Sequence, residues 1–126
     1  MTQKIKSFED FKLNKQLLLA VEENGYESPS PIQEKAIPLI MAGHDLLGIA
    51  QTGTGKTAAF VLPILMKLKY AQGANPRALI LAPSRELAMQ IDQNIKSLAA
   101  NTDLRHVCLY GGTGTKLQLE ALAQGV

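Results

Sequence analysis

A run rich in glycine and threonine carries the residue types that bind phosphate. It reads Ala50-Gln51-Thr52-Gly53-Thr54-Gly55-Lys56-Thr57. Glycine lets a backbone wrap closely around an anion, and N–H groups at the start of a helix can then face that anion. Lys56 can reach the β and γ phosphates of a nucleotide, and the Thr57 hydroxyl can ligate Mg²⁺. The run therefore predicts a P-loop for a nucleoside triphosphate.

The same run departs from the general P-loop pattern at one position. The first glycine of G-x-x-x-x-G-K-[ST] is replaced by Ala50. The plain alternative is a glycine-rich turn between a strand and a helix, with no ligand. The pattern alone also does not separate kinases, GTPases and motor ATPases.

A second candidate lies upstream, between Gly25 and Gln33. Ser30 and Gln33 have the spacing of a capping box, and Pro31 suits the first position of a helix. The functional alternative is that the Gln33 amide, which both donates and accepts, bonds the edge of adenine. The two roles are compatible, because one amide can have two partners.

Two further loops follow predicted strands. Ser84 and Arg85 open a predicted helix, where backbone N–H groups attract phosphate. The alternative is that Ser84 is only an N-cap and Arg85 a solvated charge. Gly112 could let a phosphodiester approach the backbone, or it could simply make a turn.

Helices and strands alternate in the apolar pattern. Helices are expected after Asn14, after Ser30 with a kink at Pro38, and over 57–68, 86–99 and 116–123; buried strands are expected over 46–50, 78–82 and 106–110. This order predicts an α/β fold with a parallel sheet flanked by helices. The loops 51–55, 83–85 and 111–114 would then share one edge of the sheet, where ligands bind.

Composition excludes several classes of protein. The 126 residues include 13 Lys and Arg and 11 Asp and Glu, so the net charge is +2, and 46% of residues are hydrophobic. That balance excludes a disordered or collagen-like chain and fits one domain. A single cysteine excludes a disulfide framework, and His44 and His106 show no metal-binding spacing. No apolar run approaches the roughly 18 residues of a spanning helix, and no secretory signal is visible, so a cytoplasmic location without membrane contact is expected.

Taken together, these motifs resemble those of the DEAD-box RNA helicases. Residues 50–57 resemble motif I, in which Ala50 is expected, and residues 25–33 look like the Q motif. Residues 83–88 are similar to motif Ia, with Ser84 in place of the usual threonine, and Gly111-Gly112 looks like the GG element. The order and spacing match over essentially the whole chain.

The resemblance implies ATP and Mg²⁺ as cofactors and RNA as a partner. It implies that Phe8 stacks on adenine, although Phe8, or Phe11 as a rival, could instead anchor the N-terminus on the core. The implied nucleotide-binding residues are Phe8, Tyr26, Glu27, Gln33, Gln51, Thr52, Gly53, Thr54, Gly55, Lys56 and Thr57, with Lys56 and Thr57 catalytic and Thr57 on Mg²⁺. The implied contacts to the RNA backbone, without sequence specificity, are Pro83, Ser84, Arg85, Gly111 and Gly112.

Several motifs of that family are missing from these residues. The chain contains no Asp-Glu-Ala-Asp, Ser-Ala-Thr or Thr-Pro-Gly-Arg sequence. We therefore expect a truncated, N-terminal portion of a RecA-like first helicase domain, whose parent has a second domain. Uncovered apolar faces favour self-association of the fragment. The alternatives are another P-loop ATPase, such as a DNA helicase or kinase, and a truncated module that binds nucleotide or RNA without turnover.

Overall fold

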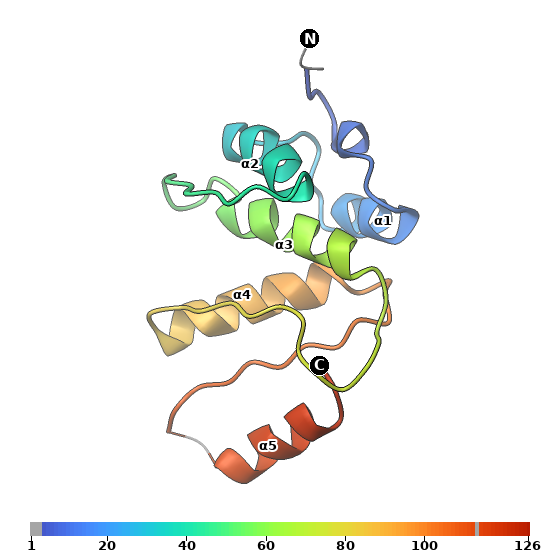
Figure 1. The fold of residues 1–126 in the computed structure, drawn as a ribbon. Helices are drawn as coiled ribbons and strands as arrows, with labels where there is room; N and C mark the ends of the chain where they lie inside the picture. Colours follow the sequence, from blue (N-terminus) through green and yellow to red (C-terminus); the bar gives the residue numbers. More distant parts are fainter. Residues whose placement is uncertain (1–3, 113) are drawn as a thin grey trace.

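Helices are the regular elements of this protein. The computed structural model describes residues 4–112 and 114–126 (Figure 1). Its elements are the 3₁₀ turn η1 (Phe8–Phe11) and the α-helices α1 (Lys15–Glu23), α2 (Pro31–Met41), α3 (Lys56–Leu68), α4 (Arg85–Leu98) and α5 (Thr115–Ala123). The helices α2 and α3 pack against each other at one end of the molecule, and α5 lies at the other end (Figure 1).

The predicted helices are confirmed, together with two of their start signals. Asn14 is the N-cap of α1, and its side chain accepts a hydrogen bond from the Leu17 N–H at 2.9 Å. Ser30 precedes Pro31 at the start of α2, and the Ser30 N–H donates to Gln33 Oε1 at 3.0 Å, as the capping box predicts. The turn η1 was not predicted, because a single 3₁₀ turn has no apolar period to detect.

The sheet prediction needs correction. No strand is formed in the described part of the chain, and no backbone hydrogen bond there joins the segments 46–50, 78–82 and 106–110. A strand is held by hydrogen bonds to its neighbours, and apolar residues alone do not supply them. Leu47, Ile49, Leu79 and Leu81 are each more than 80% exposed. The segments are apolar, as predicted, but within the described residues no strand pairs with them, and many of their side chains remain exposed.

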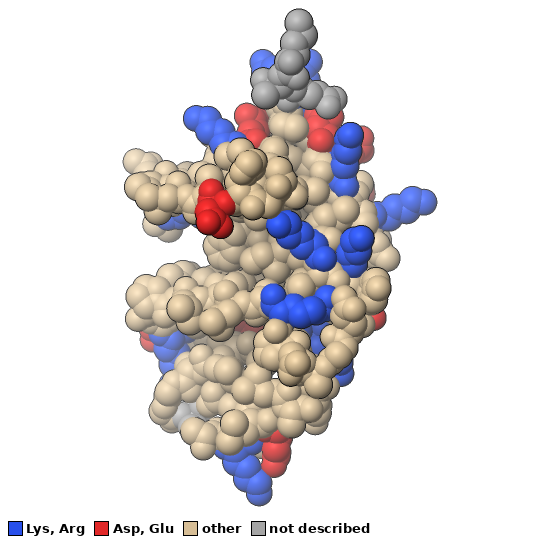
Figure 2. Space-filling model, viewed as in Figure 1, with Lys and Arg blue, Asp and Glu red and all other residues tan. Residues whose placement is uncertain are grey.

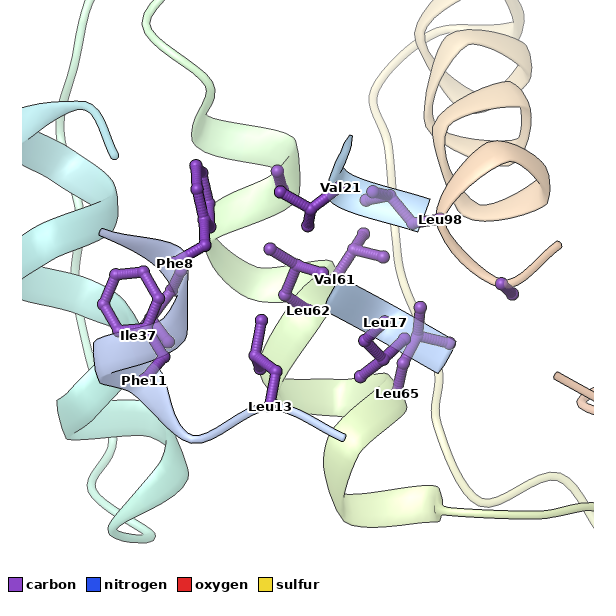
Figure 3. Packing of buried hydrophobic residues seen from close by; sticks show 12 residues of the cluster. Phe8, Phe11, Leu13, Leu17, Val21, Ile37, Val61, Leu62, Leu65 and Leu98 are labelled. Carbon is purple, nitrogen blue, oxygen red and sulfur yellow. The ribbon is translucent and has the colours of Figure 1, made fainter. Parts of the chain in front are cut away.

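The hydrophobic core lies where η1, α1, α2 and α3 meet the C-terminal end of α4. Leu17, Ile37, Leu62 and Leu98 are almost completely buried there, and Phe8 packs beside them (Figure 3). Leu62 is buried together with Val61 and Leu65, because the core surrounds α3 from more than one side. This core fixes α2 relative to α3. It therefore also fixes the end of the connecting loop, where the chain enters α3.

Below that core the molecule is open. A cleft of about 460 Å³ is lined by apolar side chains of α3, of residues 76–81, of residues 104–109 and of α5. It lies where a buried sheet was expected. Among the described residues, no helix has both the length and the apolar character to cross a membrane.

Candidate functional site

The loop that leads into α3 has a backbone shape that favours glycine. Gly53 has φ +85° and Gly55 has φ +80°, both in the left-handed region. The Thr54 hydroxyl donates to the Gln51 carbonyl at 2.6 Å and closes the turn. Gln51, Thr52 and Gly53 are exposed. The loop is therefore formed and accessible.

The start of α3 leaves backbone donors for an anion. Its N-cap is Gly55, which has no side chain to cap the helix, and the first helical bond runs from the Ala59 N–H to the Gly55 carbonyl at 3.1 Å. The N–H groups of Lys56, Thr57 and Ala58 have no acceptor among the described residues. By contrast, α1 and α4 each have a side-chain cap. The start of α3 therefore fits a phosphate group.

The two side chains expected to hold the phosphates and Mg²⁺ lie at this helix start. Lys56 is exposed and Thr57 is half-buried. Within the described part of the chain, Lys56 forms no ion pair. Its charge is therefore available to an external anion.

Gln33 connects the candidate adenine segment to the loop. Its side chain is 2% exposed, and Nε2 donates to the Gly55 carbonyl at 3.2 Å while Oε1 accepts from Ser30. A Cβ atom added at Gly55 would overlap with Gln33 Nε2. The bond from the Ser30 N–H to Gln33 confirms the glutamine half of the capping box, whereas the buried Ser30 hydroxyl has no hydrogen-bond partner among the described residues. An adenine contact by the same amide remains a prediction.

Phe8 lies in the core rather than on an open face. It is 4% exposed, with an edge-on contact to Phe11 at 5.8 Å and a tilted contact to Tyr26 at 5.9 Å between ring centroids. Both phenylalanines thus anchor the N-terminal turn. Stacking of Phe8 on adenine is not tested by this arrangement. Tyr26 is half-buried beside Phe8, and Glu27 is exposed.

The candidate RNA loops lie at the start of α4 and after residue 110. Ser84 is the N-cap of α4, and its hydroxyl accepts from the Leu87 N–H at 3.2 Å. Pro83, Arg85, Gly111 and Gly112 are exposed, and Gly112 has φ +85°. The Arg85 guanidinium lies over the Tyr110 ring, 4.4 Å from its centroid. These residues therefore bring the two loops together.

Tyr110 was missed by the sequence analysis. The available signal was an aromatic residue directly before the two glycines, but such a residue also fits the end of a buried strand. On the face shown in Figure 2, Lys and Arg side chains are scattered rather than gathered into one patch. On this face, the two candidate RNA loops therefore do not belong to an extended basic patch.

The remaining ionisable groups of the described residues can be compared with known metal-binding arrangements. Among the described residues, no group of three His, Cys, Asp or Glu side chains could hold a metal ion. His106 Nδ1 instead lies 2.7 Å from Asp92 Oδ1. Burial raises the pKa of the Cys108 thiol, and the Asp92 charge raises it further.

Comparison with known proteins places the chain in a family. The family model for DEAD/DEAH box helicases matches residues 30–126. "Probable ATP-dependent RNA helicase DDX46" of Homo sapiens is 45% identical over 125 residues, which are 96% of this chain and 12% of that protein. "DEAD-box ATP-dependent RNA helicase RhpA" of Helicobacter pylori (strain B128) is 51% identical over 114 residues, 90% of this chain and 23% of that protein. The chain thus spans a minor part of these relatives.

Two solved structures share its backbone course. The RNA helicase Prp28 from Chaetomium thermophilum, bound to ADP, has a TM-score of 0.88 and 39% identity, covering 99% of this chain and 31% of that one. A DEAD box protein from Methanococcus jannaschii has a TM-score of 0.89 and 34% identity, covering 98% and 34%. The likeness to these structures confirms the expected RecA-like course of the backbone. It does not confirm the sheet, because no strand forms in the described residues. The chain belongs to the DEAD/DEAH box helicase family.

Proposed function

We propose that this chain provides the adenine-nucleotide site of an ATP-dependent RNA helicase. It would form the N-terminal portion of a RecA-like first domain, with the Q motif at 25–33, motif I at 50–57, motif Ia at 83–88 and the GG element at 111–112. The observation that carries the proposal is the Gln33 Nε2 bond to the Gly55 carbonyl, which joins the Q motif to the phosphate loop. This buried bond holds the two segments against each other, as a binding site shared between them would require.

The residues of the loop would bind and orient the phosphates. Gly53 is open, because nothing lies within 4 Å of a Cβ atom added there, and this leaves room for an anion against the backbone. The free N–H groups at the start of α3 would donate to phosphate oxygens, and Lys56 would add a full positive charge. The Thr57 hydroxyl would hold Mg²⁺. ATP, when bound, would supply the γ-phosphoryl group that is transferred to water, leaving ADP, and this hydrolysis would drive the helicase.

The adenine end would be set by the Q motif. Gln33 uses one N–H and one lone pair of Oε1 within the chain, so a second N–H and a second lone pair remain for adenine. Tyr26 and the backbone at Glu27 lie in the same segment. Phe8 would have to leave its present packing to stack on the base.

RNA would bind along the edge formed by motif Ia and the GG element. Pro83 and Ser84 lead into α4, which begins at Arg85. The contact between Arg85 and Tyr110 brings the following Gly111-Gly112 turn close to this helix start. Backbone amides and one arginine recognise phosphates without reading bases, so the binding would not depend on sequence. A net charge of +2 is compatible with such a local site.

Unwinding would be a property of a longer helicase. The acidic Asp-Glu-Ala-Asp sequence is not among these residues, and neither are the motifs of a second domain. We expect the 126-residue chain to bind adenine nucleotide weakly and to show negligible RNA-stimulated turnover. Robust turnover by the purified chain would contradict that expectation. The match to a helicase family disfavours the kinase alternative. If the ATPase assay shows no turnover, the result would support the alternative of a module that binds nucleotide or RNA without hydrolysis.

Removal of the loop lysine tests the proposal. We expect Lys56→Ala to weaken ATP binding more than Gln33→Ala does, because a phosphate charge pair contributes more than one amide bond. Titration calorimetry with ATP and Mg²⁺ measures both affinities. Lys67→Ala is the matched control, because Lys67 lies in the last turn of the same helix, far along the axis from the loop. Unchanged affinity for Lys56→Ala would contradict the P-loop assignment.

A further inference from the structure

The contact between Arg85 and Tyr110 joins two loops that are far apart in the sequence. Arg85 is the first residue of α4, and Tyr110 directly precedes the Gly111-Gly112 turn. The guanidinium carbon lies 4.4 Å from the ring centroid, well within the range of a cation–π contact. A planar guanidinium on an aromatic face is oriented as well as attracted.

Tyr110 is itself held in place from a third element. The Gln118 side chain, on α5, donates through Nε2 to the Tyr110 carbonyl at 3.1 Å. Tyr110 is half-buried, while Arg85 is exposed. The backbone of Tyr110 is therefore bonded to α5, and its ring is less exposed than the arginine that lies over it.

The arginine keeps its charge for another ligand. In the described residues Arg85 forms no ion pair with a carboxylate. An arginine stacked on an aromatic ring still has N–H donors at the edge of its plane, because stacking uses only the face. Those donors belong to the first residue of α4, and Gly112, two residues after Tyr110, is exposed with nothing within 4 Å of an added Cβ atom.

We propose that Tyr110 is a positioning residue for RNA binding. It holds the Arg85 guanidinium at the edge shared by α4 and the Gly111-Gly112 turn, and thereby presents the arginine to a phosphodiester group. This inference rests on the proposed RNA contact of Arg85, and it adds a residue that neither the P-loop nor the RNA-binding motifs contain. The function of Tyr110 would be to reduce the freedom of the arginine before RNA arrives.

The test uses the complete 126-residue chain and a fluorescein-labelled oligouridylate, with binding followed by anisotropy. Tyr110→Leu should weaken binding by about two- to fivefold, the size expected for an exposed cation–π contact. Tyr110→Phe keeps the ring and should restore wild-type affinity. In an Arg85→Ala background, Tyr110→Leu should cause no further loss, because the tyrosine then has no arginine to position.

A second variant covers the case in which Tyr110→Leu does not fold, which circular dichroism would reveal. Arg85→Lys keeps the positive charge but removes the planar stacking, so it should weaken binding by a similar factor. The salt dependence separates the two arginine variants. Arg85→Ala should reduce the slope of log K against log salt by about 0.7, whereas Arg85→Lys should leave the slope unchanged.

The outcomes distinguish this inference from the proposed function. If the wild-type chain does not bind the oligonucleotide, or if Arg85→Ala binds like wild type, the RNA contact itself fails and the inference fails with it. If Arg85→Ala weakens binding but Tyr110→Leu and Arg85→Lys do not, only the positioning role is overturned. Equal loss from Tyr110→Leu with and without Arg85 would also overturn it.

Discussion

Gly55 meets two structural requirements at the same position, one of the backbone and one of side-chain packing. Its φ of +80° suits the turn into α3, and its missing side chain makes room for Gln33 Nε2. Gly53 has a similar φ of +85°, but nothing lies within 4 Å of an added Cβ atom. The two glycines therefore share the backbone requirement and differ in the packing requirement.

This difference gives a matched pair of variants. Gly55→Ala should lower the free energy of unfolding by about 1–3 kcal/mol more than Gly53→Ala, because only the first inserts a methyl group into an occupied space. Denaturant unfolding, followed by circular dichroism, measures both variants. In a Gln33→Ala background the excess should largely disappear. An equal cost at both glycines would contradict the contact as described.

Among the secondary-structure elements, the starts of the helices could be predicted from the sequence, whereas the arrangement of the three apolar segments could not. Asn14, Ser30 and Ser84 each precede a helix at the predicted place, because a cap acts on N–H groups only two or three residues away. The segments 46–50, 78–82 and 106–110 were predicted as buried strands; they are apolar and non-helical, but no strand forms there in the described residues. The sequence could not show whether these three segments pair with one another, because strand pairing depends on residues that are far apart in the sequence.

The candidate site divides in the same way. The candidate P-loop is a local feature, and the positive φ of Gly53 and Gly55 agrees with the pattern from which the loop was predicted. The Gln33 bond to Gly55 spans 22 residues and the Arg85 contact to Tyr110 spans a helix, and neither had a periodic signal. Phe8 was predicted either to stack on adenine or to anchor the N-terminus on the core. In the chain without nucleotide, its burial shows the second arrangement.

The cap of α1 can be tested directly. Asn14→Ala should lower the free energy of unfolding by about 1 kcal/mol, because the Leu17 N–H would lose its acceptor where the helix enters the core. Thermal unfolding monitored by circular dichroism measures the change. Asn94→Ala is a suitable control, since Asn94 lies inside α4 and is not a cap. A loss at Asn94 as large as that at Asn14 would show that capping is not the cause.

For the whole molecule, the open apolar cleft is the main consequence of the missing sheet. Leu79 and Leu81 line it and are 81% and 84% exposed. Isolated apolar residues are common on surfaces, but here they gather around one cleft with unpaired backbone beside them. The molecule therefore has a well-packed half around α2 and α3 and a half whose apolar surface is uncovered.

We expect this surface to drive self-association. Sedimentation should show mass increasing with concentration, and Leu81→Lys should lower the association constant by about tenfold or more, because a covered leucine contributes about 1.5–3 kcal/mol. Leu19→Lys is the control, since Leu19 is an exposed leucine on α1 and does not line the cleft. A chain that remains monomeric at every concentration would contradict this expectation.

The central claim is that the loop before α3 binds the phosphates of an adenine nucleotide. The most direct measurement is an amide ¹H–¹⁵N NMR titration of the chain with ATP and Mg²⁺. The account predicts that the largest shifts fall on the backbone amides of residues 53–58, with smaller ones at residues 26–33, and that GTP causes weaker changes. Shifts concentrated around the apolar cleft at residues 76–81, or no shifts at residues 53–58 at saturating ATP, would contradict it.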